Sequence, residues 1–314
     1  MTPRQRDSRL RAILTPTLNP HSPQTEAIAA VFNVVLLIAA VVFVIVASGV
    51  VYCVARYRGR GGAGEPRANF GSRGIEILWT VVPLLIVTVL FVITVRAMVL
   101  IDAPQGGGQT ADLIVTGHQW WWDARYPNRV VVTGDIHIPV GRRWLVRIES
   151  SDVIHDFWVP ELARKMDAVP GRPSNIWLEA DRPGIYLGTC SEFCGAQHAW
   201  MRFRVIAEPE ASFETWLNGE ARGAPAKTER LFDEKGCRKC HTLASAEPSS
   251  GKGPSLAHLA SREFLGGGIS RNTPQNLMLW LTDPQAAKPG NRMPGTPLSA
   301  QERGTLLNFM ENLR

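Results

Sequence analysis

Cysteine is scarce in this chain, and its scarcity excludes a fold held together by many disulfides. The 314 residues contain 5 cysteines, whereas disulfide scaffolds depend on several bridges in a short chain. Two short clusters, one beginning at Cys190 and one at Cys237, hold four of the five. The remaining residue, Cys53, lies in an apolar run, where packing is the expected role.

The sequence shows little sign of a nucleic-acid-binding surface or of a cleavable signal peptide. The formal net charge is only +6, and basic residues are not interleaved with aromatic ones, so we expect no nucleic-acid partner. The N-terminal segment, residues 1–26, carries several arginines without an adequate apolar stretch after them, so a cleavable signal peptide is not evident. The excess of arginine is interpreted as charge that flanks a membrane.

Two long apolar runs predict a transmembrane hairpin over residues 27–100. Residues 27–55 and 75–100 both exceed the ~20 residues that cross a bilayer, so membrane lipid is an expected partner. The arginine-rich loop between them, residues 56–74, favours the cytoplasmic side.

Residues 101–218 change to the pattern of short strands punctuated by glycine and proline, which predicts an all-β sandwich. We expect strands at 112–116, 129–133, 135–140, 144–149, 175–179, 184–189 and 201–206. A short amphipathic helix is expected over 209–220, a linker over 219–227, and an all-α domain over 228–314.

The densest group of metal ligands lies in Cys190-Ser-Glu-Phe-Cys-Gly-Ala-Gln-His-Ala-Trp-Met201. Thiolate and thioether ligands select copper or iron over hard cations, and trigonal His/Cys copper sites often add a weak axial methionine. Zinc is the first rival, because Cys190, Cys194 and His198 with one more histidine would complete a tetrahedral set. A disulfide is the plain alternative in an oxidising compartment. Met201 favours copper.

The second cluster, Cys237-Arg-Lys-Cys240-His241, has the attachment signature of c-type haem. Two thioether bonds would hold the porphyrin, and the adjacent imidazole would reach the iron. A thioredoxin-like dithiol needs a βαβ context, and a zinc half-site needs a second cysteine pair. Neither pattern is found in this part of the sequence.

The other axial ligand of such a haem must come from the rest of the tail. Met278 and Met310 lie at spacings that suit a packed helical face, whereas Met293 lies in the irregular segment Asn-Arg-Met-Pro-Gly-Thr. A fixed loop can aim its sulfur at the iron, so Met293 is the predicted ligand. His/Met ligation raises the haem potential, which suits an electron relay that feeds an oxidant.

These motifs resemble those of known families. The 190–201 segment resembles the binuclear copper A loop of cytochrome c oxidase subunit II, further matches run through residues 76–207, and the methionine segment resembles class I cytochromes c. The first resemblance implies a cupredoxin-like fold in which two thiolates bridge two copper ions. The implied ligands are His155, Cys190, the backbone carbonyl of Glu192, Cys194, His198 and Met201. Two other histidines, His118 and His137, are interpreted as structural.

Further roles are implied by the same resemblance. In that family, Glu76 corresponds to a residue at the mouth of a proton channel in subunit I, and Trp120 to the residue that receives electrons from cytochrome c. The side chain at Glu192 helps to bind a magnesium shared with subunit I, and the segment 165–172 faces subunit I. This sequence departs from the family pattern at Trp121, where tyrosine is more usual. The plain alternative for Glu76 is a solvated residue in the headgroup region.

The sequence therefore predicts the electron-input subunit of a proton-translocating cytochrome c oxidase with a fused cytochrome c domain. Electrons from a cytochrome c or a bc-type complex would pass through the haem and copper A to subunit I, where oxygen is reduced, and subunit III is an expected neighbour. Haem attachment occurs outside the bacterial cytoplasm in this class. Both the N-terminus and the C-terminal domains are thus expected on the outer side of the inner membrane.

Two other functions would account for part of this pattern. A copper A subunit can also feed a nitric oxide reductase, but Glu76 and the loop that faces subunit I favour the oxidase. A membrane-anchored copper-delivery or redox-sensing protein would explain the copper ligands but not the haem motif that follows them.

Overall fold

A computed structural model of the chain describes residues 18–58, 71–105, 109–222, 230–246 and 251–314. Contacts divide the chain into two units, of which one is formed by residues 26–102 and the other by the rest of the chain. Much of the expected N-terminal segment, of the loop at 56–74 and of the linker at 219–227 lies outside the described residues.

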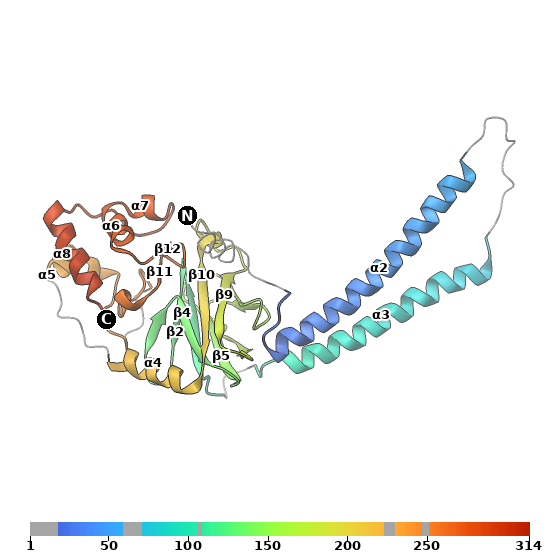
Figure 1. Cartoon of the computed structure of the whole chain (residues 1–314), viewed down its shortest axis with the longest axis horizontal. Helices are drawn as coiled ribbons and strands as arrows, with labels where there is room; N and C mark the ends of the chain where they lie inside the picture. The colour runs from blue at the N-terminus through green and yellow to red at the C-terminus, as the bar shows by residue number, and fades with distance from the viewer. Residues whose placement is uncertain (1–17, 59–70, 106–108, 223–229, 247–250) are drawn as a thin grey trace. The chain divides into compact units, whose positions relative to one another are not determined.

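The smaller unit consists of two apolar helices, α2 (Pro23–Tyr57) and α3 (Arg73–Ile101), which run in opposite directions (Figure 1). Their 35 and 29 residues are long and apolar enough to cross a membrane. Side chains such as Phe43 and Val99 are 72% and 75% exposed, which is costly in water and favourable in lipid. The predicted hairpin is therefore confirmed, with each helix slightly longer than the apolar run that predicts it.

The second unit begins with two five-stranded sheets that form the predicted cupredoxin-like sandwich. One sheet has the order β3-β2-β1-β5-β8, and the other has the order β4-β10-β9-β6-β7. The first contains β1 (Leu113–His118), β2 (Trp121–Arg125), β3 (Val131–Thr133), β5 (Trp144–Ser150) and β8 (Ser174–Leu178). The second contains β4 (Asp135–Pro139), β6 (His155–Trp158), β7 (Met166–Ala168), β9 (Gly184–Cys190) and β10 (Arg202–Glu208).

Aromatic side chains fill the space between the sheets. Trp122 of β2 makes edge contacts with Phe157 of β6 and Phe203 of β10, at ring-centroid distances of 5.6 and 5.7 Å. Phe157 and Phe203 stack at 4.6 Å. All three rings are buried, and such pairs stabilise a core by about 0.5–1.5 kcal/mol beyond their burial. This core fixes β6, β9 and β10, the strands that carry or flank the predicted copper ligands.

A helix and a smaller helical domain follow the sandwich. The helix α4 (Glu210–Arg222) packs Phe213 and Trp216 against the sandwich core. The helical domain contains α5 (Arg230–Glu234), η2 (Cys237–Lys239), η3 (Leu259–Ser261), β11 (Phe264–Leu265), β12 (Ser270–Arg271), α6 (Pro274–Thr282), α7 (Pro284–Ala287) and α8 (Ala300–Glu311). Phe232, Leu306 and Met310 lie in its own apolar core, separate from that of the sandwich.

The close approach of β9 and β10 leads to a stability prediction. A Cβ added at Gly188 would lie 2.2 Å from the ring of Phe203, so Gly188→Ala should lower the free energy of unfolding by about 1–3 kcal/mol. Thermal unfolding of the full chain in detergent measures this. Gly219→Ala is the control, since nothing lies within 4 Å of its added carbon. Equal stability of the two variants would contradict the packing described.

Candidate functional site

The predicted copper ligands gather at one end of the sandwich. Cys190 is the last residue of β9, and Met201 immediately precedes β10. The backbone N–H of Cys190 donates to the carbonyl oxygen of Met201 at 3.1 Å, which closes the loop between the two strands. Inside this loop the short 3-10 helix η1 (His198–Trp200) turns the chain back toward the sandwich.

The sulfur and nitrogen atoms of these residues form one compact group. The Sγ atoms of Cys190 and Cys194 are 3.8 Å apart, too far for a disulfide. His155 Nδ1 lies 3.9 Å from Cys190 Sγ, and His198 Nδ1 lies 3.7 Å from Cys194 Sγ. Met201 Sδ is 3.8 Å from Cys194 Sγ. His155 of β6 and two residues of the 190–201 loop, His198 and Met201, thus converge on the two thiols.

The surroundings of the two thiols suit a soft metal. Cys190, Cys194 and Met201 are buried, and the carbonyl oxygen of Glu192 lies 3.3 Å from Cys190 Sγ, while the Glu192 side chain is exposed. The hydrogen bond with Cys194 lowers the pKa of Cys190 below that of an ordinary thiol, which favours its thiolate form. Thiolate, imidazole and thioether together are the donor set that copper prefers, and the residues present therefore fit copper.

A carboxylate orients one of the imidazoles. Asp152 Oδ1 lies 2.8 Å from His155 Nε2, which leaves Nδ1 directed at the thiols. Burial opposes ionisation of Asp152, but hydrogen bonds from His155 and from the backbone N–H groups of Val153 and Gln119 lower its pKa below the ordinary value. The role of Asp152 was not predicted from the sequence. Its position three residues before His155 is the signal that could have indicated a carboxylate partner for this imidazole.

Trp120 lies directly against the copper loop. Its indole Nε1 donates to the carbonyl oxygen of Cys194 at 2.9 Å, and Gln119 Nε2 donates to the same oxygen at 2.6 Å. Gly195 has φ +111°, and a Cβ there would lie 3.0 Å from the Trp120 ring, so this close approach depends on glycine. The predicted electron acceptor is thereby hydrogen-bonded to a predicted copper ligand, and Gln119 is a contact that sequence reasoning missed.

Two histidines outside this cluster have partners in the sandwich. His118 stacks on Trp121 at a centroid distance of 4.6 Å and lies 3.1 Å from the Asp123 carboxylate. His137 stacks on Trp216 at 3.8 Å and contacts Glu208. These contacts agree with the structural role predicted for both.

The segment expected to face subunit I, residues 165–172, contributes one member of a carboxyl pair. Asp156 of β6 is opposite Asp167 of β7. Burial, together with the hydrogen bond with Asp167, raises the pKa of Asp156 to about 7. Lys165 and Arg172 line the same hollow. Cationic side chains of the segment therefore lie in the same hollow as a carboxyl whose pKa is raised well above its ordinary value.

Glu76 lies in the first turn of α3 and is exposed. Its backbone carbonyl accepts a hydrogen bond from Thr80 Oγ1 at 2.8 Å. The structure places this carboxylate at the end of an apolar helix, as the sequence predicts, which is compatible with either of its two predicted roles.

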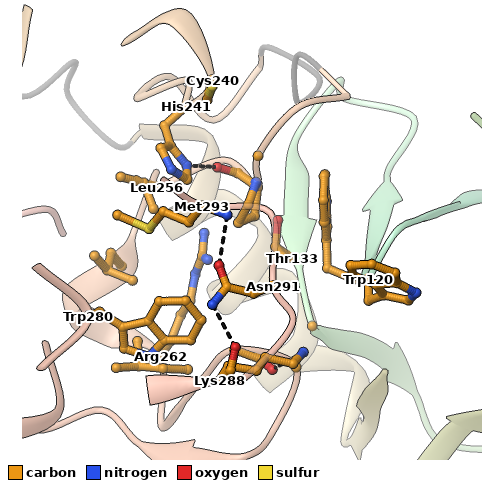
Figure 2. Close-up of a pocket in the computed structure, with 18 of the residues that line it drawn as sticks. Trp120, Thr133, Cys240, His241, Leu256, Arg262, Trp280, Lys288, Asn291 and Met293 are labelled. Atoms are coloured by element: carbon orange, nitrogen blue, oxygen red, sulfur yellow. Dashed lines mark hydrogen bonds between the residues drawn. The ribbon is translucent and has the colours of Figure 1, made fainter. Parts of the chain in front are cut away.

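The haem attachment motif faces a cavity of about 420 Å³. Cys237, Cys240, His241 and Met293 all line it, and Figure 2 shows His241 and Met293 directed into the same space. Apolar side chains form much of the remaining wall, namely Phe232, Leu256, Leu277, Leu281 and Leu306. Of the other two methionines in this domain, Met310 also borders the cavity but is packed into the helical core from α8, and Met278 lies on α6.

The predicted proximal ligand is held in the tautomer that a haem requires. His241 Nδ1–H donates to the carbonyl oxygen of Pro254 at 2.8 Å, which leaves the Nε2 lone pair for a metal. Burial lowers the pKa of His241, which keeps the ring neutral. A Cβ at Gly253 would lie 2.8 Å from His241 Cε1, so only glycine fits behind the ring. These residues fit a haem.

A half-buried cation completes the cavity. Arg262 lines it, and its guanidinium donates to the carbonyl oxygens of Ser255 and Ala257, both at 2.7 Å. Buried cations need anionic or carbonyl partners, and the carboxylate groups of a haem would add to the two carbonyls. The place of Arg262 in the cavity wall was not predicted, because nothing in its local sequence pattern indicates that it lines a cavity.

Comparison with known proteins covers nearly the whole chain. The transmembrane domain of cytochrome C oxidase subunit II matches residues 18–97, its periplasmic domain matches residues 130–208, and the cytochrome c family matches residues 225–314. The "Cytochrome c oxidase subunit 2" of Alkalihalophilus pseudofirmus is 33% identical over 311 residues, which are 95% of this chain and 90% of the relative. The "Quinol oxidase subunit 2" of Bacillus subtilis is 32% identical over 228 residues, 69% of this chain and 70% of the relative.

A solved structure, the periplasmic domain of subunit II of cytochrome oxidase from Bradyrhizobium japonicum, is similar at 29% identity and a TM-score of 0.34. It covers 36% of this chain and 95% of that chain.

The membrane hairpin, the sandwich with its soft-metal cluster and the helical domain with its haem motif define a membrane-anchored electron-transfer protein that binds copper and haem. The chain belongs to the cytochrome c oxidase subunit II family and carries a C-terminal cytochrome c domain.

The paired thiols lead to a test of the metal site. Cys194→Ser should abolish a binuclear copper centre, because one thiolate cannot bridge two ions as two thiolates do. Met201→Leu should retain both ions and chiefly shift the potential, since it removes a weak ligand. Copper content and the paramagnetic resonance spectrum of the purified protein distinguish these outcomes. A single-copper spectrum in the unsubstituted protein, or a preference for zinc in competition, would contradict a centre in which Cys190 and Cys194 share two copper ions.

Proposed function

We propose that this chain is the electron-input subunit of a haem-copper cytochrome c oxidase in the bacterial inner membrane. It accepts electrons at its cytochrome c domain and passes them through its sandwich domain to subunit I, where oxygen is reduced to water and protons are pumped. The N-terminus and both folded domains lie on the outer, periplasmic side. Its partners are subunit I, subunit III and an external donor such as a cytochrome c or a bc-type complex.

One observation carries this proposal. Trp120 is hydrogen-bonded to the carbonyl of Cys194 at 2.9 Å and also lines the cavity that contains His241 and Met293. The indole is therefore shared by the two sites, as is the side chain of Gln119, which lines the same cavity and donates to the same carbonyl. An electron that leaves the haem cavity reaches the thiols across the indole and one hydrogen bond.

The ligands assign the cofactors. His155, Cys190, the carbonyl of Glu192, Cys194, His198 and Met201 would hold two copper ions, and Cys237, Cys240, His241 and Met293 would hold one covalently attached haem c. These groups supply one-electron redox chemistry when bound. The exposed Glu192 side chain would contribute to a magnesium shared with subunit I, because a hard cation prefers carboxylate oxygen.

The protein's own residues fix the ligands and exclude water. Asp152 orients His155, and Pro254 orients His241. Burial of both thiols and of Met201 keeps the copper ligands out of water, so the groups around the metal have little freedom to rearrange when charge changes. Preorganisation of this kind lowers the cost of each electron transfer.

The order of electron flow can be tested at the haem. Met293→Ala removes the proposed axial sulfur, so it should perturb the haem and block fast reduction of copper by an external donor, although no copper ligand is changed. Stopped-flow reduction followed at haem and copper wavelengths measures both steps. Met278→Ala, on α6, is the matched control and should behave like the unsubstituted chain. Copper reduction at the normal rate in Met293→Ala would mean that an external cytochrome reaches Trp120 directly.

The proton role of Glu76 has its own test. If this carboxylate lies at a channel mouth, Glu76→Gln in the assembled oxidase should slow turnover, because the amide cannot exchange protons, and should leave the copper and haem spectra intact. Oxygen uptake by the purified complex measures turnover. Unchanged turnover would return Glu76 to the role of a solvated headgroup residue.

A further inference from the structure

The loop at residues 288–293 contacts both redox sites. It follows α7 and ends at Met293, whose backbone N–H donates to Asn291 Oδ1 at 2.7 Å. Asn291 Nδ2 donates to the carbonyl oxygen of Lys288 at 2.6 Å, so the loop is folded on itself. The sulfur of Met293 points into the haem cavity, while Trp120 lies across from this loop, in the turn between β1 and β2 (Figure 2).

The residue next to the haem ligand contacts the indole next to the copper loop. The guanidinium carbon of Arg292 lies 5.3 Å from the centroid of the Trp120 ring, within the range of a cation–π contact. One of its terminal nitrogens also donates to Gln119 Oε1. Gln119 and Trp120 both donate to the Cys194 carbonyl. Arg292 is therefore separated from this proposed copper ligand by a single side chain, either Gln119 or Trp120.

A buried lysine holds the other end of the same loop. Lys288 is 3% exposed, and its Nζ donates to the carbonyl oxygens of Trp200 at 3.1 Å and of Gly266 at 2.8 Å. Trp200 lies between two copper ligands in the sequence. Gln197 of the copper loop in turn donates to the carbonyl oxygen of Pro289. The loop is therefore attached to the copper loop at one end and to Trp120 at the other.

We propose that Arg292 is the positioning residue that holds the haem-ligand loop against Trp120, and so sets the rate at which an electron passes from the haem domain to the copper loop. The inference rests on the proposed function and adds to it the residue that couples the two sites. The step moves one electron from the reduced haem to the oxidised copper centre, and no bond forms or breaks.

Arginine suits this position better than lysine. Its planar guanidinium can lie over an indole and donate to an amide oxygen at the same time, whereas an ammonium is a compact, strongly hydrated charge. The side chain of Arg292 is exposed, so its replacement opens no cavity in the core. Lys288 is less suitable for a test, because its loss would leave two carbonyls unpaired in a buried place.

The test uses the intact oxidase with both cofactors bound. Haem in the fused domain is photoreduced in a flash, and the appearance of the electron at copper is timed in the unsubstituted enzyme, Arg292→Gln, Arg292→Lys and Arg271→Gln. Arg292→Gln should slow the transfer roughly tenfold, since it loses a cation–π contact and a charge-assisted hydrogen bond. The transfer rate of Arg292→Lys should lie between those of the unsubstituted enzyme and Arg292→Gln. Arg271→Gln, an exposed arginine of the same domain that stacks on Phe264, should be unaffected.

A second readout does not depend on electron transfer. Hydrogen exchange of the backbone amides at residues 195–202 should be faster in Arg292→Gln than in Arg271→Gln, because the copper loop loses a neighbour that holds it. The haem and copper spectra should be unchanged in all variants. Altered haem spectra would show that Arg292 only supports Met293 and would overturn the inference, as would slower transfer without faster exchange.

The outcomes also separate the inference from the proposed function. If the unsubstituted enzyme transfers no electron from haem to copper, the proposed order of flow fails and the inference fails with it. If that transfer occurs and Arg292→Gln matches it in rate, the proposed function stands and only the role of Arg292 is wrong.

Discussion

The pair of hydrogen bonds accepted by the carbonyl oxygen of Cys194 joins the main parts of the site. Trp120 and Gln119 donate to it, and both come from the turn between β1 and β2 in the opposite sheet. The same turn donates a backbone N–H to Asp152 at 2.7 Å, and Asp152 in turn orients His155. One turn therefore positions an indole, the imidazole of one proposed copper ligand and the backbone of another, Cys194. A change that moved this turn would disturb the proposed electron acceptor and the metal together.

Connection in one chain gives the two domains an advantage over separate proteins. The helix α4 ends at Arg222 and α5 begins at Arg230, so only a short stretch of chain joins the sandwich to the haem domain. A short tether replaces a diffusional encounter by an intramolecular one, with an effective concentration that can reach about millimolar. At such a concentration even weak, exposed contacts such as that of Arg292 with Trp120 are enough to hold the domains together. Stronger docking would be needed if the two were separate.

Local patterns predicted most of the fold and most of the residues that gather at the candidate site, and long-range pairs could not be predicted. The apolar runs predicted the hairpin. The candidate ligands between Cys190 and Met201 lie close together because they belong to one loop that joins two neighbouring strands. The aromatic segment that forms β2 was interpreted only as a strand end that packs one or two tryptophans into the core, and its extent as a strand was not predicted, since three adjacent tryptophans show no alternation. Gln119 and Cys194 are 75 positions apart, and Arg292 and Gln119 are 173 apart. Such partners are set by packing, which a single sequence does not display.

The central claim is that electrons pass from the fused haem domain across Trp120 to the copper loop within one chain. The most direct measurement is the rate of haem oxidation and of copper reduction after flash reduction of the haem in the intact oxidase, recorded over a range of enzyme concentrations. The account predicts that the two signals share one rate, that this rate is independent of concentration, and that it falls in Trp120→Phe, which lacks the indole N–H. Copper reduction whose rate rises in proportion to the concentration of an external cytochrome, while the fused haem stays reduced, would contradict it.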